Sequence, residues 1–168
     1  MWKEKIEQAY QNDRRNFSGE NMTDADLREL HLSDADLTGA DMTDADLSGA
    51  DLSGADLSGA NLRYANLTGA DLTGADLTEA CMTGADLTGA NLTGVILTGA
   101  ILTGAILTGA DLTGAYMRGA RMTDADLRGA DMTDADLTGA DLRRAILTGA
   151  NLTGTKAILK AALDFMRS

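Results

Sequence analysis

The sequence of 168 residues lacks proline altogether and contains a single cysteine, Cys81, and a single histidine, His31. One cysteine excludes an intrachain disulfide, and one histidine excludes metal centres or proton relays that need two imidazoles. No apolar run approaches the roughly 20 residues that a membrane span requires, and residues 1–5 lack the apolar segment of a signal peptide. We therefore expect a cytoplasmic protein that does not contact a membrane.

Positive charge and aromatic residues are also scarce. Lysine and arginine number 14 against 26 aspartates and glutamates, so the formal net charge is −12, and aromatic residues make up 4% of the chain. This balance argues against direct nucleic-acid binding through a basic face, and it fits either a solvated acidic surface or one that engages cationic partners. Few aromatics and 19 glycines are typical of disordered chains, but 44% apolar residues is too high a share for that class.

What the sequence does contain is one repeat of five residues. From Phe17 to Leu152 every fifth residue is Leu, Met or Phe, in 28 consecutive positions without a slip, and we call it the central residue. Ala usually stands two places before it, and Asp or Asn one place before it. Thr or Ser usually follows it, and then Gly. The unit is Ala-Asp-Leu-Thr-Gly, and we call its Asp or Asn position the outward residue.

The five-residue period excludes an α-helix and fits a chain that turns in every unit. Five residues advance a helix by about 500°, so the central residues would scatter around its surface. In extended backbone the Ala and the central residue point to one side, and the outward residue points to the other. A type II turn over Leu-Thr-Gly-Ala places Gly where a positive φ is needed, and Asp tolerates that conformation. We expect another kind of turn at the positions that do not suit it: Glu29, Tyr64, Glu79 and Arg144.

A turn in every unit winds the chain into a coil whose levels stack at strand spacing. Four turns close a square, so one coil takes four units and 28 units give about seven coils, although the period alone fixes neither the number of sides nor the handedness. From Arg15 to about Thr155 these tandem A(D/N)LXX units resemble the pentapeptide-repeat family. The resemblance implies an all-β fold: a right-handed quadrilateral β-helix of about seven coils, with short helical caps.

We predict three segments. Residues 1–14 form an N-terminal capping helix, because apolar residues recur there at every fourth position, and residues 15–154 form the repeat. Residues 155–168 form a second helix, which serves either as a cap on a monomer or as the contact of a homodimer, since open coil ends invite pairing. The apolar face of this helix consists of Ile158, Leu159, Ala162, Leu163 and Met166.

With four units per coil, outward residues that are four units apart stack in columns, and one group of them is apolar. Ile96, Ile101 and Ile106 occupy neighbouring faces at one level, where the repeat otherwise favours Asp, and Tyr116 and Cys81 extend this belt. Apolar side chains on an acidic rod are a candidate protein contact. The alternative is that β-branched side chains simply favour extended backbone.

A second group of outward residues is acidic. The fourth column, which begins at His31, contains Asp51, Asp71, Asp111 and Asp131 without an aliphatic or cationic interruption. One hypothesis is that this face imitates a nucleic-acid backbone and is gripped by a DNA-binding protein. The alternative is that the carboxylates keep a β-rod soluble and resistant to edge pairing.

The arginines are unevenly distributed. Four are expected near one corner of the last two coils, paired with aspartates rather than binding an anion: Arg118, Arg121, Arg143 and Arg144. Their expected partners are Asp136 and Asp141. Three others are expected to be solitary surface charges: Arg28, Arg63 and Arg128.

Catalysis needs unlike groups gathered in a pocket, and this repeat offers near-identical aspartates on a convex surface. The glycines are single turn residues rather than a phosphate-binding loop, and no EF-hand pattern occurs. We expect no enzyme activity, no cofactor, and neither a catalytic nor a metal site.

The predicted function is therefore a non-catalytic scaffold that binds a protein partner through the faces of an acidic β-helical rod. Some pentapeptide-repeat proteins are acidic dimeric rods that imitate DNA. The resemblance therefore implies an alternative, a DNA-mimicking inhibitor or protector of a type II topoisomerase such as gyrase. A third hypothesis, an idealised rod with no biological partner, is opposed by irregular residues such as Tyr64, Cys81 and Val95.

Overall fold

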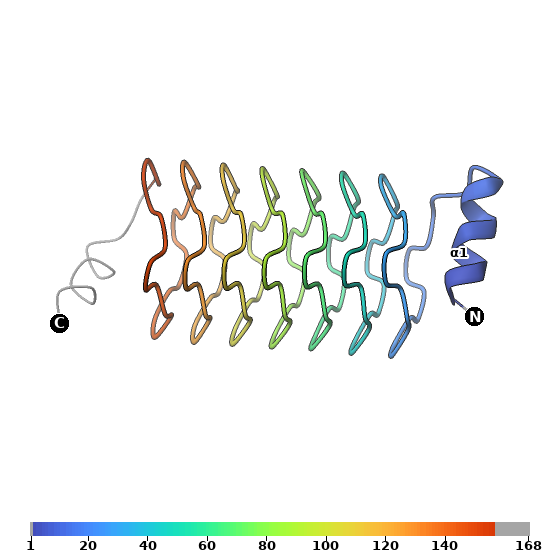
Figure 1. The fold of residues 1–168 in the computed structure, drawn as a ribbon, viewed down its shortest axis with the longest axis horizontal. Helices are drawn as coiled ribbons and strands as arrows, with labels where there is room; N and C mark the ends of the chain where they lie inside the picture. Colours follow the sequence, from blue (N-terminus) through green and yellow to red (C-terminus); the bar gives the residue numbers. More distant parts are fainter. Residues whose placement is uncertain (1, 157–168) are drawn as a thin grey trace.

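The computed structural model describes residues 2–156, which form one helix followed by a long solenoid (Figure 1). Helix α1 spans Trp2–Gln11, and every fifth residue from Asn16 to Lys156 forms an isolated β-bridge. The predicted apolar face from Ile158 to Met166 lies outside the described residues. A turn in every unit leaves one residue in five for bridging, so the described chain contains no longer strand.

Parallel bridges always join residues 20 positions apart. The first series begins with the pair Asn16 and Asp36 and continues in steps of 20 to Lys156. Three further series have the same step and begin at Asn21, Asp26 and His31. We call these series the first, second, third and fourth ladders. Outward residues that are four units apart are thus neighbours along the axis of the solenoid.

In a unit that has a level on each side, the ladders bind three of the five backbone N–H groups and the turn binds a fourth. The outward N–H donates to a carbonyl of the preceding level, whereas the N–H groups of the central residue and of the turn Gly donate to carbonyls of the following level. For Asp56, Leu57 and Gly59 these N···O distances are 2.9, 2.7 and 2.9 Å. Ala60 donates back across the turn to the Leu57 carbonyl at 3.0 Å. The N–H of Ser58 has no backbone acceptor, and it donates to the Asp56 carboxylate at 2.9 Å.

Central residues and alanines fill the interior. The central side chains from Met22 to Leu137 are at most 1% exposed. Each such Leu stabilises the fold by about 1.5–3 kcal/mol relative to an exposed one. Asp136 is the one buried polar or charged residue of the described chain. The groups that a partner can reach therefore lie at the outward and turn positions.

One expectation about the turns is wrong. The four residues expected to avoid the left-handed region adopt it, with φ between 58° and 60°: Glu29, Tyr64, Glu79 and Arg144. The ladders hold the backbone on both sides of every turn, so one geometry repeats whatever the side chain. A local strain of about 1–2 kcal/mol per residue is therefore tolerated. The predicted type II geometry itself, with a positive φ at the third turn residue, is confirmed.

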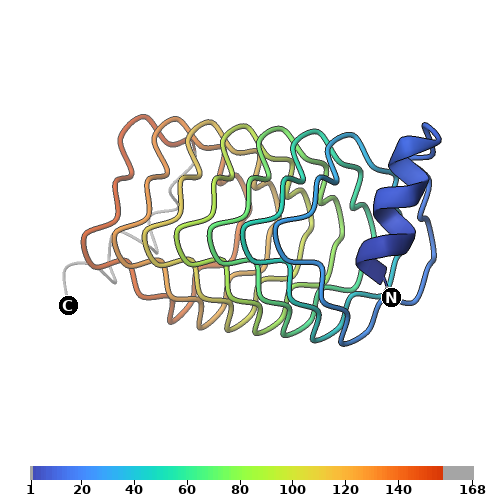
Figure 2. The ribbon, with the colours of Figure 1, turned by 45° about the vertical axis from the view of Figure 1, so that its right-hand side comes forward.

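Helix α1 lies across the N-terminal end of the solenoid (Figures 1 and 2). Ile6 is 1% exposed and belongs to the interior cluster, and Trp2 and Tyr10 are packed against it. The Tyr10 ring stacks on Phe17 with a centroid distance of 6.1 Å, and its hydroxyl donates to the Ser33 carbonyl at 3.1 Å. Burial raises the pKa of Tyr10 to about 12. Apolar and polar contacts thus join α1 to the first level of the ladders.

Candidate interaction surfaces

The outward residue binds backbone as well as facing solvent. The Asp71 carboxylate accepts the N–H of Thr73 at 3.0 Å and the hydroxyl of the same residue at 2.6 Å. Asn91 does the same and accepts the Thr93 N–H at 3.2 Å. This bond satisfies the one N–H of each unit that has no backbone carbonyl as its acceptor. A carboxylate or amide oxygen at this position therefore satisfies a backbone N–H, and this role does not require a negative charge.

The four aspartates of the predicted acidic face lie in the fourth ladder, whose bridges run without a break from His31 to Asn151. The carboxylates accept the N–H two residues later at distances between 2.9 and 3.1 Å: Asp51, Asp71, Asp111 and Asp131. Hydrogen bonding from the Ser53 hydroxyl lowers the pKa of Asp51. This face is consequently a row of fixed, oriented acceptors rather than of freely rotating carboxylates.

The predicted apolar belt is spread over three ladders. Ile96 and Tyr116 are bridge partners in the first ladder, and Tyr116 is 53% exposed. Ile101 bridges Cys81 in the second ladder, and Ile106, which is 40% exposed, lies in the third. A partner with a flat surface would contact one or two of these side chains. A partner that wraps around several faces of the solenoid would contact all of them.

Sequence reasoning misses two exposed apolar residues. Tyr64 is 57% exposed and occupies a turn position that otherwise holds mostly Gly or Asp. Its ring lies so close to Gly84 that a Cβ there would be 2.7 Å from two ring carbons. Ile146, which is 46% exposed, replaces an outward Asp in the third ladder. Ile146 could have been identified as Ile106 was, from an aliphatic residue at an outward position. Tyr64 could have been identified from a bulky side chain at a turn position.

Two of the predicted arginine pairs are confirmed. Arg118 donates from Nε to the Asp136 carboxylate at 2.7 Å, and Arg143 binds Asp141 at 2.6 Å. The Thr138 hydroxyl and the Arg118 guanidinium together lower the pKa of Asp136 to about 2. Arg121 is exposed and forms no ion pair with any of residues 2–156, so its predicted pairing is wrong.

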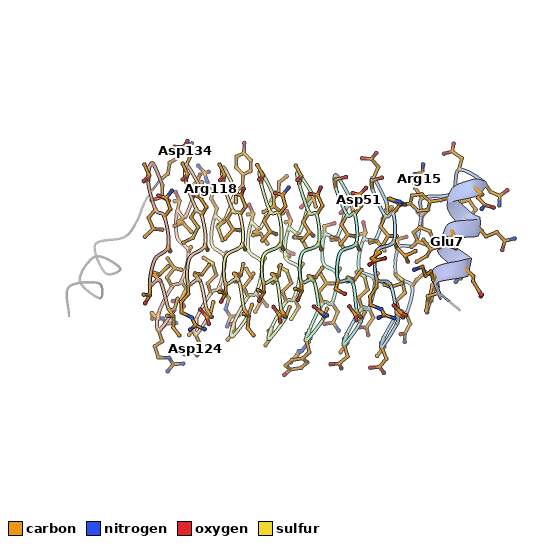
Figure 3. The ribbon with its side chains drawn as sticks, viewed as in Figure 1. Glu7, Arg15, Asp51, Arg118, Asp124 and Asp134 are labelled. Carbon is orange, nitrogen blue, oxygen red and sulfur yellow. The ribbon has the colours of Figure 1, made fainter. Side chains whose placement is uncertain are left out.

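The expectation that Arg28 and Arg128 are solitary is also wrong. An Arg two positions after an outward Asp folds back on it, as Arg28 does on Asp26 at 2.7 Å, and Arg128 repeats this geometry. Arg144 pairs with Asp124, which lies 20 positions earlier, at 2.5 Å. In Figure 3 the labelled Arg118 and Asp124 lie at opposite edges of the C-terminal part of the solenoid. Ion pairs therefore occur at more than one edge of this region.

Charge is divided unequally along the axis. Residues 1–86 contain 18 acidic and six basic residues, a net charge of −12, whereas residues 116–156 contain six of each. Between these regions, residues 87–110 contain no charged residue at all. The N-terminal half alone thus accounts for the formal net charge of the whole protein.

The remaining features of the described residues concern metal ligation, membrane-spanning helices and a surface hollow. Among residues 2–156 no three His, Cys, Asp or Glu side chains are grouped so that they could hold a metal ion. Within the same residues, no helix has the length and apolar character needed to cross a bilayer. An open hollow between α1 and the first level is lined by Ile6, Glu7, Tyr10, Gln11, Glu29, Leu30 and His31. The His31 side chain is 87% exposed, and its Nδ1 atom is 3.8 Å from the Asp51 carboxylate.

Comparison with known families identifies the class of protein. A family model described as pentapeptide repeats matches residues 21–59, 55–94, 85–124 and 120–156. These matches cover well over half of the chain and coincide with the ladders. The chain therefore belongs to the pentapeptide-repeat family, whose members form right-handed β-helices.

Two solved structures are similar to this chain at the level of fold and sequence. HetL from the cyanobacterium Nostoc sp. strain PCC 7120, a pentapeptide repeat protein involved in heterocyst differentiation regulation, is 29% identical, with a TM-score of 0.59. The match covers 89% of this chain and 94% of HetL. A trypsin-treated form of QnrB1, a plasmid-mediated fluoroquinolone resistance protein, is 27% identical with a TM-score of 0.59, over 88% of this chain and 82% of QnrB1. A comparison with curated proteins gives no match.

Proposed function

We propose that this protein is a non-catalytic scaffold that binds a protein partner through the faces of an acidic, right-handed quadrilateral β-helix. Four pentapeptides in each coil and about seven coils give four flat faces, one for each ladder. The interior supports this function because it is filled by apolar side chains, which leaves only outward and turn residues for contacts. Those residues are dispersed on a convex surface, an arrangement that suits recognition rather than catalysis.

The observation that carries the proposal is the replacement of outward aspartates by aliphatic residues that are half-buried (Ile96 and Ile101) or exposed (Ile106). An Ile at this position cannot accept the N–H two residues later, so Ile96, Ile101 and Ile106 each give up a bond that Asp or Asn would make. The fold gains no interior packing in return, because these side chains point outward. Binding of a partner accounts for residues that the ladder itself disfavours.

The test is to restore the residue of the repeat at all three positions, Ile96→Asp, Ile101→Asp and Ile106→Asp. The triple variant should be at least as stable as the wild type, because each Asp regains its hydrogen bond, and it should lose the partner. In-cell crosslinking followed by mass spectrometry compares the two proteins, and Ile146→Asp serves as the matched control on the same rod. Retention of every wild-type partner by the triple variant would contradict the proposal.

Both ends of the solenoid must be capped in this proposal, because an open end leaves apolar side chains and unpaired backbone groups exposed. Helix α1 caps the first level, since Ile6 enters the interior cluster there. Residues 155–168 contribute either a second cap on a monomer or the contact of a homodimer. We further propose that the protein is cytoplasmic and uses no cofactor.

A second candidate function, a DNA-mimicking inhibitor or protector of a type II topoisomerase, is favoured by the fourth ladder. Its carboxylates are held in one row by hydrogen bonds to backbone, as fixed charges along a line. Similarity to QnrB1, a fluoroquinolone resistance protein, points in the same direction.

A gyrase supercoiling assay tests this second function with the protein present and absent. The matched variant carries Asn at four positions, which removes the charge and keeps the hydrogen bonds: Asp51→Asn, Asp71→Asn, Asp111→Asn and Asp131→Asn. If the wild-type protein inhibits supercoiling by gyrase and the variant does not, the result supports mimicry of DNA charge. If the wild-type protein leaves supercoiling unchanged, the DNA-mimic function is excluded.

A further inference from the structure

The second ladder differs from the other three in charge. The outward residues of each of the other ladders include four aspartates. The second ladder has only two aspartates and one arginine among its members: Asn21, Asp41, Asn61, Cys81, Ile101, Arg121 and Asp141. Like charges oppose the association of two molecules that each carry a charge of −12. The second ladder is therefore the face on which two copies of this protein repel each other least.

Charges on and beside the second ladder are also ordered along the axis. Glu79, in the turn that leads into this ladder at Cys81, is exposed and forms no ion pair with any of residues 2–156. Arg121 is likewise exposed and unpaired within that part of the chain. Glu79 lies one level before Ile101, and Arg121 lies one level after it. Such a surface complements itself only when a second copy runs in the opposite direction.

We propose that a second copy of this chain packs on the second ladder in antiparallel orientation, with the two-fold axis at Ile101. In this arrangement Ile101 meets its counterpart, and Glu79 of each copy reaches the level of Arg121 of the other. Residues two levels from Ile101 also meet. Tyr64 of one copy lies at the level of Arg144 of the other, where a guanidinium can stack on the exposed ring.

The level that contains Ile101 is suited to close approach. No charged residue occurs between Leu87 and Ala110, so no unpaired charge is buried at the centre of the contact. The turn that follows Ile101 contains Gly104, and a Cβ placed there would meet no atom within 4 Å. Backbone and the Ile101 side chain can therefore form a flat, uncharged centre with charged pairs on either side, as in other specific interfaces.

Cysteine crosslinking tests the axis of this dimer. A disulfide requires Cα atoms within about 7 Å of each other, so only a residue at the two-fold axis links to itself. The full-length double variant Cys81→Ser, Ile101→Cys should become a disulfide-linked dimer under mild oxidation, whereas the wild type, with Cys81 opposite the level of Arg121, should not. The matched controls carry Cys81→Ser with Ile96→Cys or Ile106→Cys, at the same level on the neighbouring ladders, and should stay unlinked.

Charge reversal provides an independent readout by sedimentation equilibrium. Glu79→Arg and Arg121→Glu should each weaken the dimer about tenfold, and the double variant should recover most of that loss, because the two-fold axis exchanges the partners. Ile101→Asp should abolish the dimer without unfolding the protein, since Asp is the usual residue of this position. Ile146→Asp on the third ladder is its control and should leave the dimer unchanged.

Three results would overturn the proposal. One is a wild type that remains monomeric at about 0.1 mM, where a dimer of micromolar affinity is populated. Another is crosslinking of wild-type Cys81 as efficient as that of Ile101→Cys, which indicates parallel or random contacts. The third is a dimer unaffected by Ile101→Asp, which places the contact elsewhere, for example in residues 155–168.

Discussion

The N-terminal and C-terminal parts of the solenoid share one backbone and differ in charge. Residues 16–86 and 116–156 follow the same ladders, with the same hydrogen bonds between levels, and the central side chains of both regions are buried as far as Leu137. Residues 1–86 nevertheless carry the net charge of −12, whereas arginine–aspartate pairs accompany a balanced charge in residues 116–156. The fold therefore does not dictate the charge of its surface.

This difference is possible because the outward position has only one structural role, and the ladders form even where that role is not filled. An oxygen atom there accepts the N–H two residues later, at Asn91 as at Asp71, but the bridges continue through Ile96 and Ile101, which have no such oxygen. Charge, apolar character and side-chain length are consequently free to vary along the rod. The interior, where each side chain contacts the levels before and after it, has no such freedom.

The largest expected effect concerns the interior and should be equal in the two regions. Leu57→Ala and Leu127→Ala each remove a side chain that is 0% exposed, so each should lower the free energy of unfolding by about 2–5 kcal/mol. Urea denaturation monitored by circular dichroism measures both. A cost below about 1 kcal/mol in one region only would show that the two interiors are packed differently.

A smaller effect on the free energy of unfolding is expected at Gly84, where the Tyr64 side chain of the preceding level lies over the turn. Gly84→Ala places a Cβ 2.7 Å from the Tyr64 ring at a φ of +68°, whereas Gly104→Ala meets no atom within 4 Å at a φ of +66°. Gly104→Ala should cost about 1 kcal/mol, and Gly84→Ala should cost about 1 kcal/mol more. Adding Tyr64→Gly should bring the cost of Gly84→Ala down to that of Gly104→Ala. Equal costs for the two single variants would mean that the ring does not lie over Gly84.

The pH dependence of stability should distinguish the arginine-paired region. The pKa of Asp136 is lowered to about 2, so the unfolded chain binds its proton more readily than the folded protein does. The stabilisation from this carboxylate is present above about pH 4 and is lost as the pH falls toward about 2. Asp136→Asn should flatten the decline of the thermal midpoint over that range. Asp56→Asn, in the same ladder and with a pKa lowered by the Ser58 hydroxyl but no arginine, should flatten it less, and an equal effect would contradict the role of Arg118.

The smallest effect on stability is expected from variants that remove a single negative charge and keep the hydrogen bond. Asp51→Asn and Asp131→Asn keep the hydrogen bond to backbone and remove one negative charge each. In the acidic region Asp51→Asn should stabilise the protein by a few tenths of a kcal/mol at low ionic strength, whereas Asp131→Asn should change little. About 1 M salt should abolish the difference, because it screens repulsion between carboxylates. A difference that survives high salt would point to an effect other than net charge.

Much of this architecture follows from the sequence because the period is short and unbroken. The five-residue spacing excludes a helix, predicts which residues are interior, and places the turn at Thr-Gly. One kind of error arises where contacts between levels outweigh local preference, since Glu29 and Tyr64 adopt a left-handed φ because the ladders hold the turn. The error at Arg28 is of another kind, because this side chain folds back on Asp26 within its own unit.

The candidate surfaces were harder to predict, since they depend on which outward residues become neighbours. The sequence identified Ile96, Ile101 and Ile106 as irregular, and the tertiary structure distributed them over three ladders. It also showed that the outward aspartates bind backbone N–H groups, a role that no spacing in the sequence reveals. By itself the sequence determined the interior, because burial follows from a period that places one apolar side chain in every unit. Only the tertiary structure decided the surface, because its neighbours are four units apart along the chain and meet only when the coils stack.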